Sequence, residues 1–344
     1  MPGRPRVVYV TRPPNPRISR WERLKQTLVP WYLHPADGFL LASLRRVADV
    51  QELSREAFWR RHDRGRLEAD VVAVNFKCGR LDPRPDDEVL REFDRVRRPK
   101  LLVVADDRPD KLPGDVVLDV FEVVFKREPY RDRDRYRVSA ANRAKLHATM
   151  LGCPLIGMWS HRTGRIDMSG VGYPTPATDA ARDAFFAGSA TDPERIAILQ
   201  ALHGNLDLHA SVQPGQQNHR LPPELVGPRL DHRRFSAAIR DARINLALAG
   251  YGPFTHRHLE LHSLAAFVVS NPGIRDLELV LDLVEGEHYV AFDDPDDLVD
   301  KCRHYLDHED ERLATAAAGR RAFERGYSLE RHGAAIRAVI DRIR

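Results

Sequence analysis

Cysteine and long apolar runs are scarce in this sequence. Its 344 residues include three widely spaced cysteines, Cys78, Cys153 and Cys302, and no C-x-x-C pair. This pattern argues against a disulfide framework and against a thiolate zinc site. We therefore expect three buried, unreactive thiols. No apolar stretch approaches the ~18–20 residues that a membrane-spanning helix needs, which argues against an integral membrane protein.

The first residues lack the features of a secretory signal. The segment MPGRPRVVYV passes from a basic tip directly into a strand-like run. It has neither the apolar stretch nor the cleavage site of a signal peptide. The expected location is therefore the cytoplasm.

Lysine is also rare. Lysine and arginine together number 54, but only seven of these are lysines, and 50 acidic residues leave a formal net charge of +4. Arginine binds carboxylates and phosphates through paired hydrogen bonds, although a GC-rich genome explains the same bias. Because acidic residues balance the arginines along the whole chain, charge alone does not predict nucleic-acid binding.

The sequence does contain a regular alternation of strand-like and helix-like segments. Buried-type strands are expected at 6–11, 70–76, 100–105, 183–187, 205–212, 244–248, 265–270 and 289–292. Helices are expected at 37–47, 86–96, 191–202, 232–242, 255–263, 294–305, 311–325 and 329–343. The pattern over 116–125 fits either a helix or a strand. Apolar strands separated by helices predict parallel sheets covered on both faces, so the expected fold class is α/β with two doubly wound Rossmann-like domains.

The composition changes between Gly157 and Asp179. This segment is rich in glycine, proline, serine and threonine, and its apolar residues show neither a helical nor a strand-like period. This change predicts an N-terminal domain over 1–160, a hinge over 161–182 and a C-terminal domain over 183–328. Ligands of doubly wound sheets bind at the carboxyl ends of the strands. A crevice faced by both domains is therefore the expected binding site.

One glycine-rich loop stands out at the end of an expected strand. Gly250-Tyr251-Gly252 leads into a helix that starts near Thr255. Glycine lets a ligand approach the backbone, and a helix N-terminus offers N–H groups to an anion. Arg257 lies in the first turn, and Glu260 lies one turn further, where a carboxylate can accept the two vicinal hydroxyls of a ribose. Structural turns of this composition are commoner than phosphate sites, so the loop alone does not settle the function.

Three segments carry a resemblance to a known family. HRHLELHSLAAFVVSN (256–271), the run 286–323 and FFAGSATDPERIAIL (185–199) resemble the nucleotide-sugar half of GT-B glycosyltransferases. The similarity is to group 1 bacterial glycosyltransferases and to the capsule-associated and protein O-glucosyltransferase family, over about 183–330. It implies a GT-B enzyme that moves a sugar from a nucleoside-diphosphate sugar to an acceptor hydroxyl. It also implies no metal or other cofactor, and a final helix, 329–344, that crosses back to the N-terminal domain.

The same resemblance implies roles for individual residues. Glu260 matches the glutamate that binds the ribose, and Arg195 and Arg257 match positions near the diphosphate. Backbone positions close to the donor correspond to Gly188, Ser189 and Gly252. Many group 1 retaining enzymes carry a second glutamate before the ribose-binding one, but the matching position here is Gly252. The stereochemical outcome and the identity of the sugar are therefore left open.

An inverting enzyme needs a base to take the proton of the acceptor hydroxyl. Asp106 and Asp107 directly follow the strand at 100–105, and His34 lies in WYLHPADG. These three residues are the candidate catalytic residues, although a turn cap before Pro109 and a surface histidine are the simpler readings. Arg12 and Lys77 also follow strands and are placed to meet an anionic ligand.

Two other functions remain open. One is a sugar-nucleotide epimerase or hydrolase of the same fold, and the other is a non-catalytic basic protein that binds nucleic acid or another polyanion. The arginine excess also permits a polyanionic acceptor such as modified DNA, besides a glycan or a small molecule. The aspartates of DDPDD (293–297) are better explained by a helix cap at Asp294 than by a metal.

Overall fold

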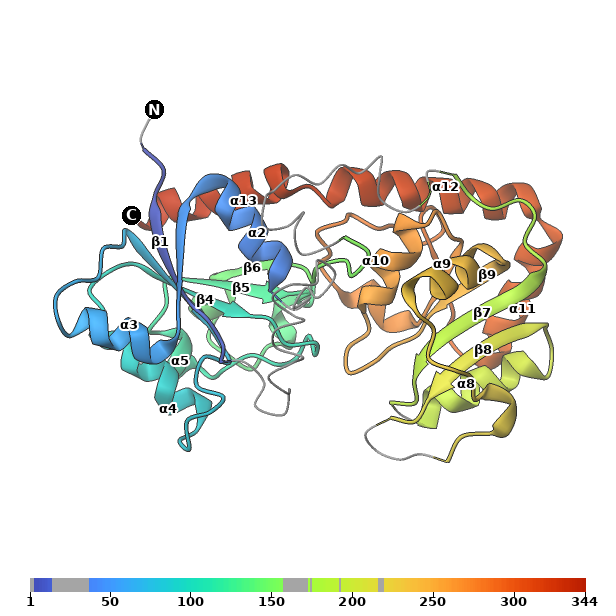
Figure 1. Cartoon of the computed structure of the whole chain (residues 1–344), viewed down its shortest axis with the longest axis horizontal. Helices are drawn as coiled ribbons and strands as arrows, with labels where there is room; N and C mark the ends of the chain where they lie inside the picture. The colour runs from blue at the N-terminus through green and yellow to red at the C-terminus, as the bar shows by residue number, and fades with distance from the viewer. Residues whose placement is uncertain (1–2, 14–36, 157–172, 174, 192, 216–219) are drawn as a thin grey trace. The chain divides into compact units, whose positions relative to one another are not determined.

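The computed structural model describes residues 3–13, 37–156, 173, 175–191, 193–215 and 220–344, which form two compact units (Figure 1). The first unit contains the described residues up to 156 together with Glu278–Val280 and Ser328–Arg344. The second unit contains the described residues from 173 to 277 together with Leu281–Tyr327. Most of the expected hinge lies outside the described residues.

The first unit is built on a six-stranded parallel sheet with the order β2-β1-β3-β4-β5-β6. Its strands are β1 (Arg6–Val10), β2 (Asp49–Leu53), β3 (Val71–Asn75), β4 (Lys100–Val104), β5 (Val123–Arg127) and β6 (Leu146–Thr149). Its α-helices are α2 (Gly38–Val47), α3 (Arg55–His62), α4 (Asp86–Arg91), α5 (Asp115–Leu118), α6 (Ala140–Arg143) and α13 (Leu329–Ile343), with 3-10 turns η1 (Glu92–Arg95) and η2 (Arg133–Arg135).

Alternate residues of these strands fill two cores, one on each face of the sheet. Val8, Val72 and Leu102 face α3, α4 and α5. Val7 and Leu101 point to the other face, which α2 and α13 cover (Figure 1). A period of two places successive side chains on opposite faces, so continuous apolar strands require both layers of helices.

Helix α13 belongs to the first unit, where it packs against α2. Gly333 permits this close approach, because a Cβ at this position would lie 2.8 Å from the backbone oxygen of Ser43. An ion pair between Arg46 and Glu330 joins the exposed sides of the two helices. The last residues of the chain thus complete the core of the first unit.

The second unit holds a five-stranded parallel sheet with the order β11-β10-β9-β7-β8. Its strands are β7 (Arg182–Ser189), β8 (Leu208–Gln213), β9 (Ala242–Ala247), β10 (Val268–Ser270) and β11 (Val290–Ala291). Its α-helices are α8 (Pro193–His203), α9 (His232–Arg240), α10 (His256–Ser263), α11 (Pro295–Asp307) and α12 (Glu309–Gly326), with 3-10 turns η4 (Pro223–Leu225) and η5 (Pro272–Asp276). Helices α8 and α11 pack their apolar residues on one face of this sheet. The α/β class and the two doubly wound sheets expected from the sequence are confirmed.

Several local expectations need correction. The pattern did not indicate β2 or α3, because β2 is an edge strand whose residues are mostly exposed and therefore carry no apolar run. The ambiguous segment 116–125 divides into the end of α5 and the start of β5. The strand expected at 183–187 extends further, since Gly188 and Ser189 also pair with β8 and end β7.

The strand orders locate the point in each sheet where the order of successive strands reverses. In the first unit β1 lies between β2 and β3, and in the second unit β7 lies between β8 and β9. Such a switch point leaves a crevice outside the carboxyl ends of the two central strands, where doubly wound folds bind ligands. A ligand site is therefore expected at the carboxyl ends of β1 and β3 in the first unit and of β7 and β9 in the second. Among the described residues, no helix is long and apolar enough to cross a membrane.

Candidate functional site

A buried arginine joins the two central strands of the second unit. Arg195, in the first turn of α8, donates from Nη1 to the backbone oxygen of Ser189 at 2.6 Å and from Nη2 to that of Leu248 at 3.1 Å. Nη2 also donates to the backbone oxygen of Ala249. These three bonds go to carbonyls at the ends of β7 and β9, so Arg195 positions the two strand ends.

The glycine-rich loop after β9 is held by a residue that the sequence did not single out. Asn271, buried just after β10, donates to the backbone oxygen of Pro253 at 2.8 Å. Within the loop the N–H of Gly250 donates to the oxygen of Gly252 at 3.0 Å, and Tyr251 is exposed. Because Asn271 precedes Pro272, its surroundings in the sequence indicate only a turn.

Helix α10 begins where this loop ends. The N–H of Thr255 donates to Nδ1 of His258 at 3.1 Å, and the other ring nitrogen of His258 lies 2.8 Å from Oγ of Ser270 on β10. Burial lowers the pKa of His258 to about 3, so the ring is neutral and serves as a fixed link between the helix start and the sheet. Oγ1 of Thr255 is buried at this helix start.

Arg257 and Glu260 form an ion pair on the first turns of α10. Nη1 of Arg257 donates to Oε2 of Glu260 at 2.8 Å, and Nη2 donates to the backbone oxygen of Ala187 in β7 at 2.7 Å. The guanidinium carbon lies 4.1 Å from the ring centre of Phe235 on α9. Only 7% of Glu260 is exposed. These contacts fix both charged groups beside the end of β7.

The start of α10 offers N–H groups to a ligand. Its first turn contains no acidic residue, the helix N-terminus carries a partial positive charge, and Arg257 is held beside it by its pair with Glu260. A glycine-containing loop directly before it leaves the backbone accessible. This combination is suited to bind an anion such as a pyrophosphate, with Glu260 close by to accept hydroxyl groups.

The second unit thus gathers the predicted donor residues around one switch point. Gly188 and Ser189 end β7, Gly250, Tyr251 and Gly252 follow β9, and Thr255, Arg257 and Glu260 begin α10. Together they span more than 70 residues of the chain, and the order of strands in the sheet brings their elements side by side. The residues that the sequence reasoning missed, Asn271 and Phe235, hold this arrangement from β10 and α9.

The candidate bases of the first unit lie just after β4 and differ in exposure. The side chain of Asp106 is 14% exposed and lies 2.9 Å from Nζ of Lys77, whereas that of Asp107 is 53% exposed and bonds Nη1 of Arg127 at 2.9 Å. Burial raises the pKa of Asp106, but the hydrogen bonds from Lys77 and from the N–H of Arg108, together with the charges of Lys77 and Lys126, outweigh burial, and the net pKa is lowered. His34 lies outside the described residues.

Further charged groups lie at the same strand ends. Lys126 is fully buried, and its Nζ donates to the backbone oxygens of Arg127 at 2.8 Å and Asp106 at 3.2 Å. Burial lowers its pKa to about 8. Arg127 also bonds the buried Glu128 at 2.6 Å. None of these residues was predicted, because KRE at the end of a strand resembles an ordinary solvent-facing turn.

The switch point between β1 and β3 carries a second polar cluster. Oδ2 of Asp37 accepts hydrogen bonds from Tyr9 and from Asn75, each at 2.8 Å. Nη2 of Arg12 is buried and has no hydrogen-bond partner within the part of the chain that the structure describes. Burial lowers the pKa of Arg12, and Asp37 acts in the opposite direction. Arg12, Asn75 and Asp37 therefore offer both donors and acceptors where this sheet is expected to bind a ligand.

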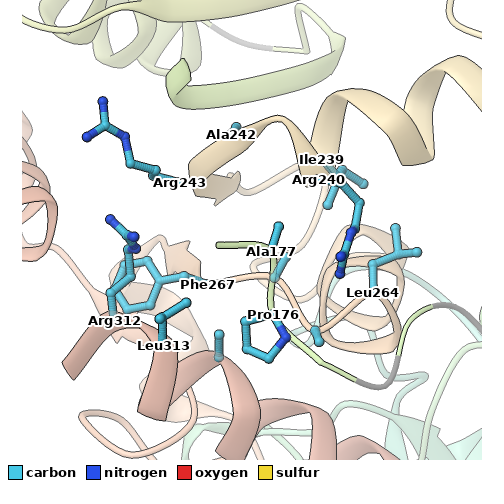
Figure 2. Close-up of a pocket in the computed structure, with 13 residues that line it drawn as sticks. Pro176, Ala177, Ile239, Arg240, Ala242, Arg243, Leu264, Phe267, Arg312 and Leu313 are labelled. Atoms are coloured by element: carbon cyan, nitrogen blue, oxygen red, sulfur yellow. The ribbon is translucent and has the colours of Figure 1, made fainter. Parts of the chain in front are cut away.

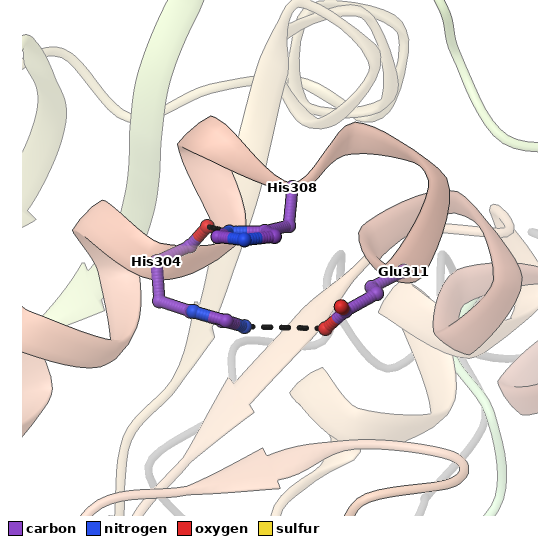
Figure 3. Close-up of side chains that lie close together, drawn as sticks. All are labelled: His304, His308 and Glu311. Atoms are coloured by element: carbon purple, nitrogen blue, oxygen red, sulfur yellow. Dashed lines mark hydrogen bonds and ion pairs between the residues drawn. The ribbon is translucent and has the colours of Figure 1, made fainter.

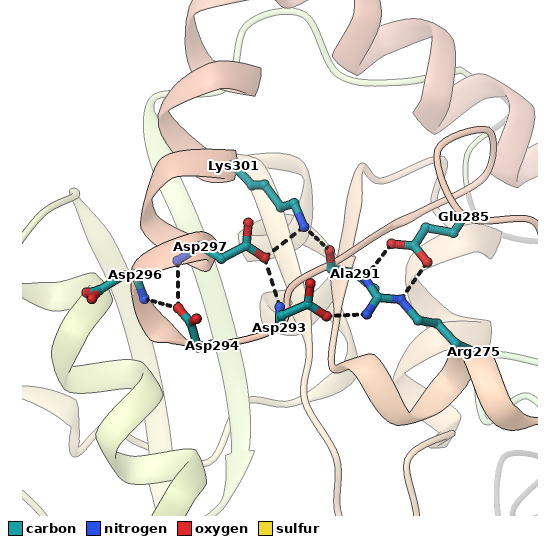
Figure 4. Close-up of polar contacts among 8 residues, drawn as sticks. All are labelled: Arg275, Glu285, Ala291, Asp293, Asp294, Asp296, Asp297 and Lys301. Atoms are coloured by element: carbon teal, nitrogen blue, oxygen red, sulfur yellow. Dashed lines mark hydrogen bonds and ion pairs between the residues drawn. The ribbon is translucent and has the colours of Figure 1, made fainter.

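Other features of the molecule are structural. A cavity of about 20 Å³ beside Arg243, Phe267 and Arg312 lies at the amino ends of β9 and β10, away from the strand ends that bind ligands (Figure 2). Asp294 caps α11 by accepting the N–H groups of Asp296 and Asp297, which confirms the cap expected within DDPDD (Figure 4). The three cysteines are buried and form no disulfide among the described residues, as expected.

Comparison with known proteins agrees with the geometry. Residues 195–338 match the family described as glycosyl transferase-like, and no curated protein matches the chain. Anabaena HepE in complex with UDP-glucose is 10% identical, with a TM-score of 0.57 over 98% of this chain and 100% of HepE. The DNA modifying enzyme β-glucosyltransferase is 10% identical, with a TM-score of 0.56 over 98% of this chain and 99% of that enzyme. Sucrose-phosphate synthase from Thermosynechococcus elongatus is 11% identical, with a TM-score of 0.56 over 98% and 99% of the two chains.

At about 10% identity these neighbours show the fold. The resemblance expected from the sequence is confirmed, both by the family match in the C-terminal half and by the shared architecture. The chain therefore has the GT-B fold, and its residues 195–338 match the glycosyl transferase-like family.

Proposed function

We propose that the protein is a glycosyltransferase that moves a sugar from a nucleoside-diphosphate sugar to an acceptor hydroxyl. The observation that carries the proposal is the Arg257–Glu260 pair at the start of α10, beside the switch point between β7 and β9. The family match over residues 195–338 covers this segment and supports the reading.

The donor is bound by its diphosphate and its ribose. The diphosphate lies at the N-terminus of α10, where backbone N–H groups, the buried Oγ1 of Thr255 and Arg257 supply donors. The ribose hydroxyls meet Glu260, whose Oε2 already accepts from Arg257. Among the described residues no hydrogen bond reaches its other oxygen, Oε1, which is thus the acceptor for a ribose hydroxyl.

The same groups stabilise the leaving diphosphate. Negative charge grows on the diphosphate as the glycosidic bond breaks, and a fixed guanidinium with a helix N-terminus stabilises that charge without a metal ion. Each donor of this kind contributes on the order of 10²–10³ in rate. Arg195 acts indirectly, since its bonds to the backbone oxygens of Ser189 and Leu248 fix the ends of β7 and β9 relative to each other.

The acceptor is bound by the first unit, at the strand ends where Asp106 and Asp107 lie. Asp107 is the better candidate for the base, because its carboxylate is half exposed, whereas Asp106 is buried against Lys77 and has a lowered pKa. A carboxylate with a lowered pKa holds an incoming proton less well. In an inverting reaction Asp107 takes the proton of the acceptor hydroxyl while the diphosphate leaves.

Thermal unfolding with nucleotides tests the donor site. UDP comes first in a panel with GDP, dTDP and CDP, because HepE and the DNA modifying β-glucosyltransferase are both described with UDP-glucose. A ligand at ~100 times its dissociation constant adds about 2.7 kcal/mol to the free energy of unfolding. One of the four should raise Tm by several degrees, and Arg257→Ala should abolish that shift.

Arg303→Ala is the matched control, because Arg303 is exposed and bonds only Asn205 and Asp300 among the described residues. No shift with any nucleotide, or an equal shift in Arg257→Ala, would overturn the donor site. Product analysis of the matching nucleotide sugar, with and without a glycan acceptor mixture, separates transfer from hydrolysis and epimerisation. Free sugar or an epimer as the main product under both conditions would contradict a transferase.

A further inference from the structure

Two histidines and a glutamate come together where α11 meets α12. His304 lies in the last turn of α11, His308 follows its end, and Glu311 lies in the first turn of α12 (Figure 3). Each residue offers one ligand atom, and these three atoms lie within 4.8 Å of one another. All three residues are exposed, so an ion can enter and water can complete its coordination.

One hydrogen bond prepares His308 as a ligand. Nδ1 of His308 lies 2.7 Å from the backbone oxygen of His304. Because a carbonyl oxygen only accepts, Nδ1 carries the proton and Nε2 keeps its lone pair. Metal-binding histidines are commonly oriented in this way by a bond from the second ring nitrogen. Nε2 of His304 lies 3.1 Å from Oε2 of Glu311, and a metal ion bound by both residues would replace the proton that these two atoms share.

The two imidazole rings lie close together and nearly parallel. Their centres are 4.0 Å apart, with an angle of 20° between the ring planes (Figure 3). Because a metal ion lies in the plane of each imidazole that binds it, the two exposed side chains must rotate out of this stacked arrangement to bring two nitrogens to the ~2.0–2.1 Å that zinc requires. Asp307 and Asp310 add negative charge at the same corner, which favours a cation over an anion.

The cluster of His304, His308 and Glu311 and the proposed donor site lie at opposite ends of the strands of this sheet. Arg303, one residue before His304, bonds Asn205 at 2.8 Å, and Tyr305 packs on Phe267 with ring centres 4.6 Å apart. Asn205 and Phe267 precede β8 and β10, so this end of α11 lies at the amino ends of the strands. A metal here would link two helices and would not touch the donor.

We propose that His304, His308 and Glu311 bind a divalent transition-metal ion, with zinc as the preferred occupant. Two imidazole nitrogens and one carboxylate oxygen are a ligand set that suits zinc, nickel and copper, whereas magnesium and calcium prefer oxygen ligands alone. Water completes a tetrahedral site. The bound ion clamps the end of α11 to the start of α12.

Isothermal titration of the metal-stripped full chain with Zn²⁺ tests the site. The wild type should bind one equivalent, Mg²⁺ should not bind, and His304→Ala should weaken the binding at least about tenfold, the loss expected for one ligand. Glu311→Gln is a second variant that keeps the size of the side chain. His203→Ala, at the end of α8, is the matched control and should bind Zn²⁺ like the wild type.

Thermal unfolding gives a second readout that needs no activity. Zn²⁺ at 100 times its dissociation constant should add about 2.7 kcal/mol to the free energy of unfolding of the wild type, and the increase should disappear in His304→Ala. Equal Zn²⁺ binding by the wild type and the double variant His304→Ala/His308→Ala would overturn the proposal. So would the absence of Zn²⁺ binding to the wild type, which would leave His304 and Glu311 as an ion pair only.

Discussion

Arg257 donates to Glu260 Oε2 at 2.8 Å and, from its other terminal nitrogen, to the backbone oxygen of Ala187 at 2.7 Å. One guanidinium therefore ties the acid of α10 to the end of β7. This link makes the helix start and the strand end a single rigid element.

Glu260→Gln should distinguish the contact with the ribose from the contact with the diphosphate. The amide keeps the shape of the side chain but removes its charge and turns one oxygen into a donor, so UDP should bind about tenfold more weakly, as expected for lost hydrogen bonds to a charged group. Inorganic pyrophosphate should be affected much less. Glu324→Gln, which alters the i,i+4 pair with Arg320, is the control. Equal losses for UDP and pyrophosphate would contradict a ribose contact.

Arg195→Met should destabilise the second unit. The variant keeps much of the apolar stem but leaves the carbonyls of Ser189, Leu248 and Ala249 without their donor. Because an unsatisfied buried polar group costs about 1–3 kcal/mol, we expect the free energy of unfolding to fall by about 2–4 kcal/mol in urea denaturation. Arg303→Met, on the exposed side of α11, should stay within about 0.5 kcal/mol of the wild type. A similar small change in Arg195→Met would show that these bonds contribute little.

Gly319→Ala should disrupt the contact between α12 and α10. The new Cβ would lie 2.6 Å from Nδ1 of His262 and 2.8 Å from the backbone oxygen of His288. Overpacking of this kind costs about 1–3 kcal/mol, which urea denaturation can measure. At Gly204 the nearest atom to an added Cβ is 3.7 Å away, so Gly204→Ala is the matched control and should unfold like the wild type. Wild-type stability in Gly319→Ala would mean that the two helices separate at no cost.

Stability should fall in mild acid because several histidines are buried in the neutral form. Burial lowers the pKa of His258 and His262 to about 3 and that of His332 to about 4. In the unfolded chain each titrates near 6.5, so the unfolded state binds more protons below that pH. The stabilising contribution of each ring is complete above about pH 6.5 and is lost progressively as the pH falls toward the folded pKa.

His332 allows this linkage to be measured at one site. It stacks on Phe39 with ring centres 5.0 Å apart and bonds Thr149 at 3.1 Å. The free energy of unfolding, measured by urea denaturation between pH 7 and pH 5, should depend on pH less steeply in His332→Phe than in the wild type. The difference should reach up to about 1.4 kcal/mol per pH unit, the value for one proton. The exposed His203→Gln should keep the wild-type slope. An unchanged slope in His332→Phe would indicate that His332 titrates alike in both states.

The sequence by itself determined the elements and the type of fold. Continuous apolar strands such as 71–75 and 100–104 can be satisfied only between two layers of helices, so parallel sheets followed from local pattern. The cap at Asp294 and the helix start at Thr255 were likewise local, since each depends on neighbours within about four residues. The edge strand β2 escaped detection because exposed residues carry no such pattern.

Only the tertiary structure decided how the candidate residues are used. Arg195 and Arg257 look alike in the sequence, yet one bonds the carbonyls of two strands and the other pairs with Glu260. The order of the strands, which brings β7 beside β9, sets that difference. Asn271 and Lys126 depend in the same way on partners that folding supplies. A side chain's type limits which bonds it can form, but the partners at hydrogen-bond distance are set by the packing of segments distant in the chain.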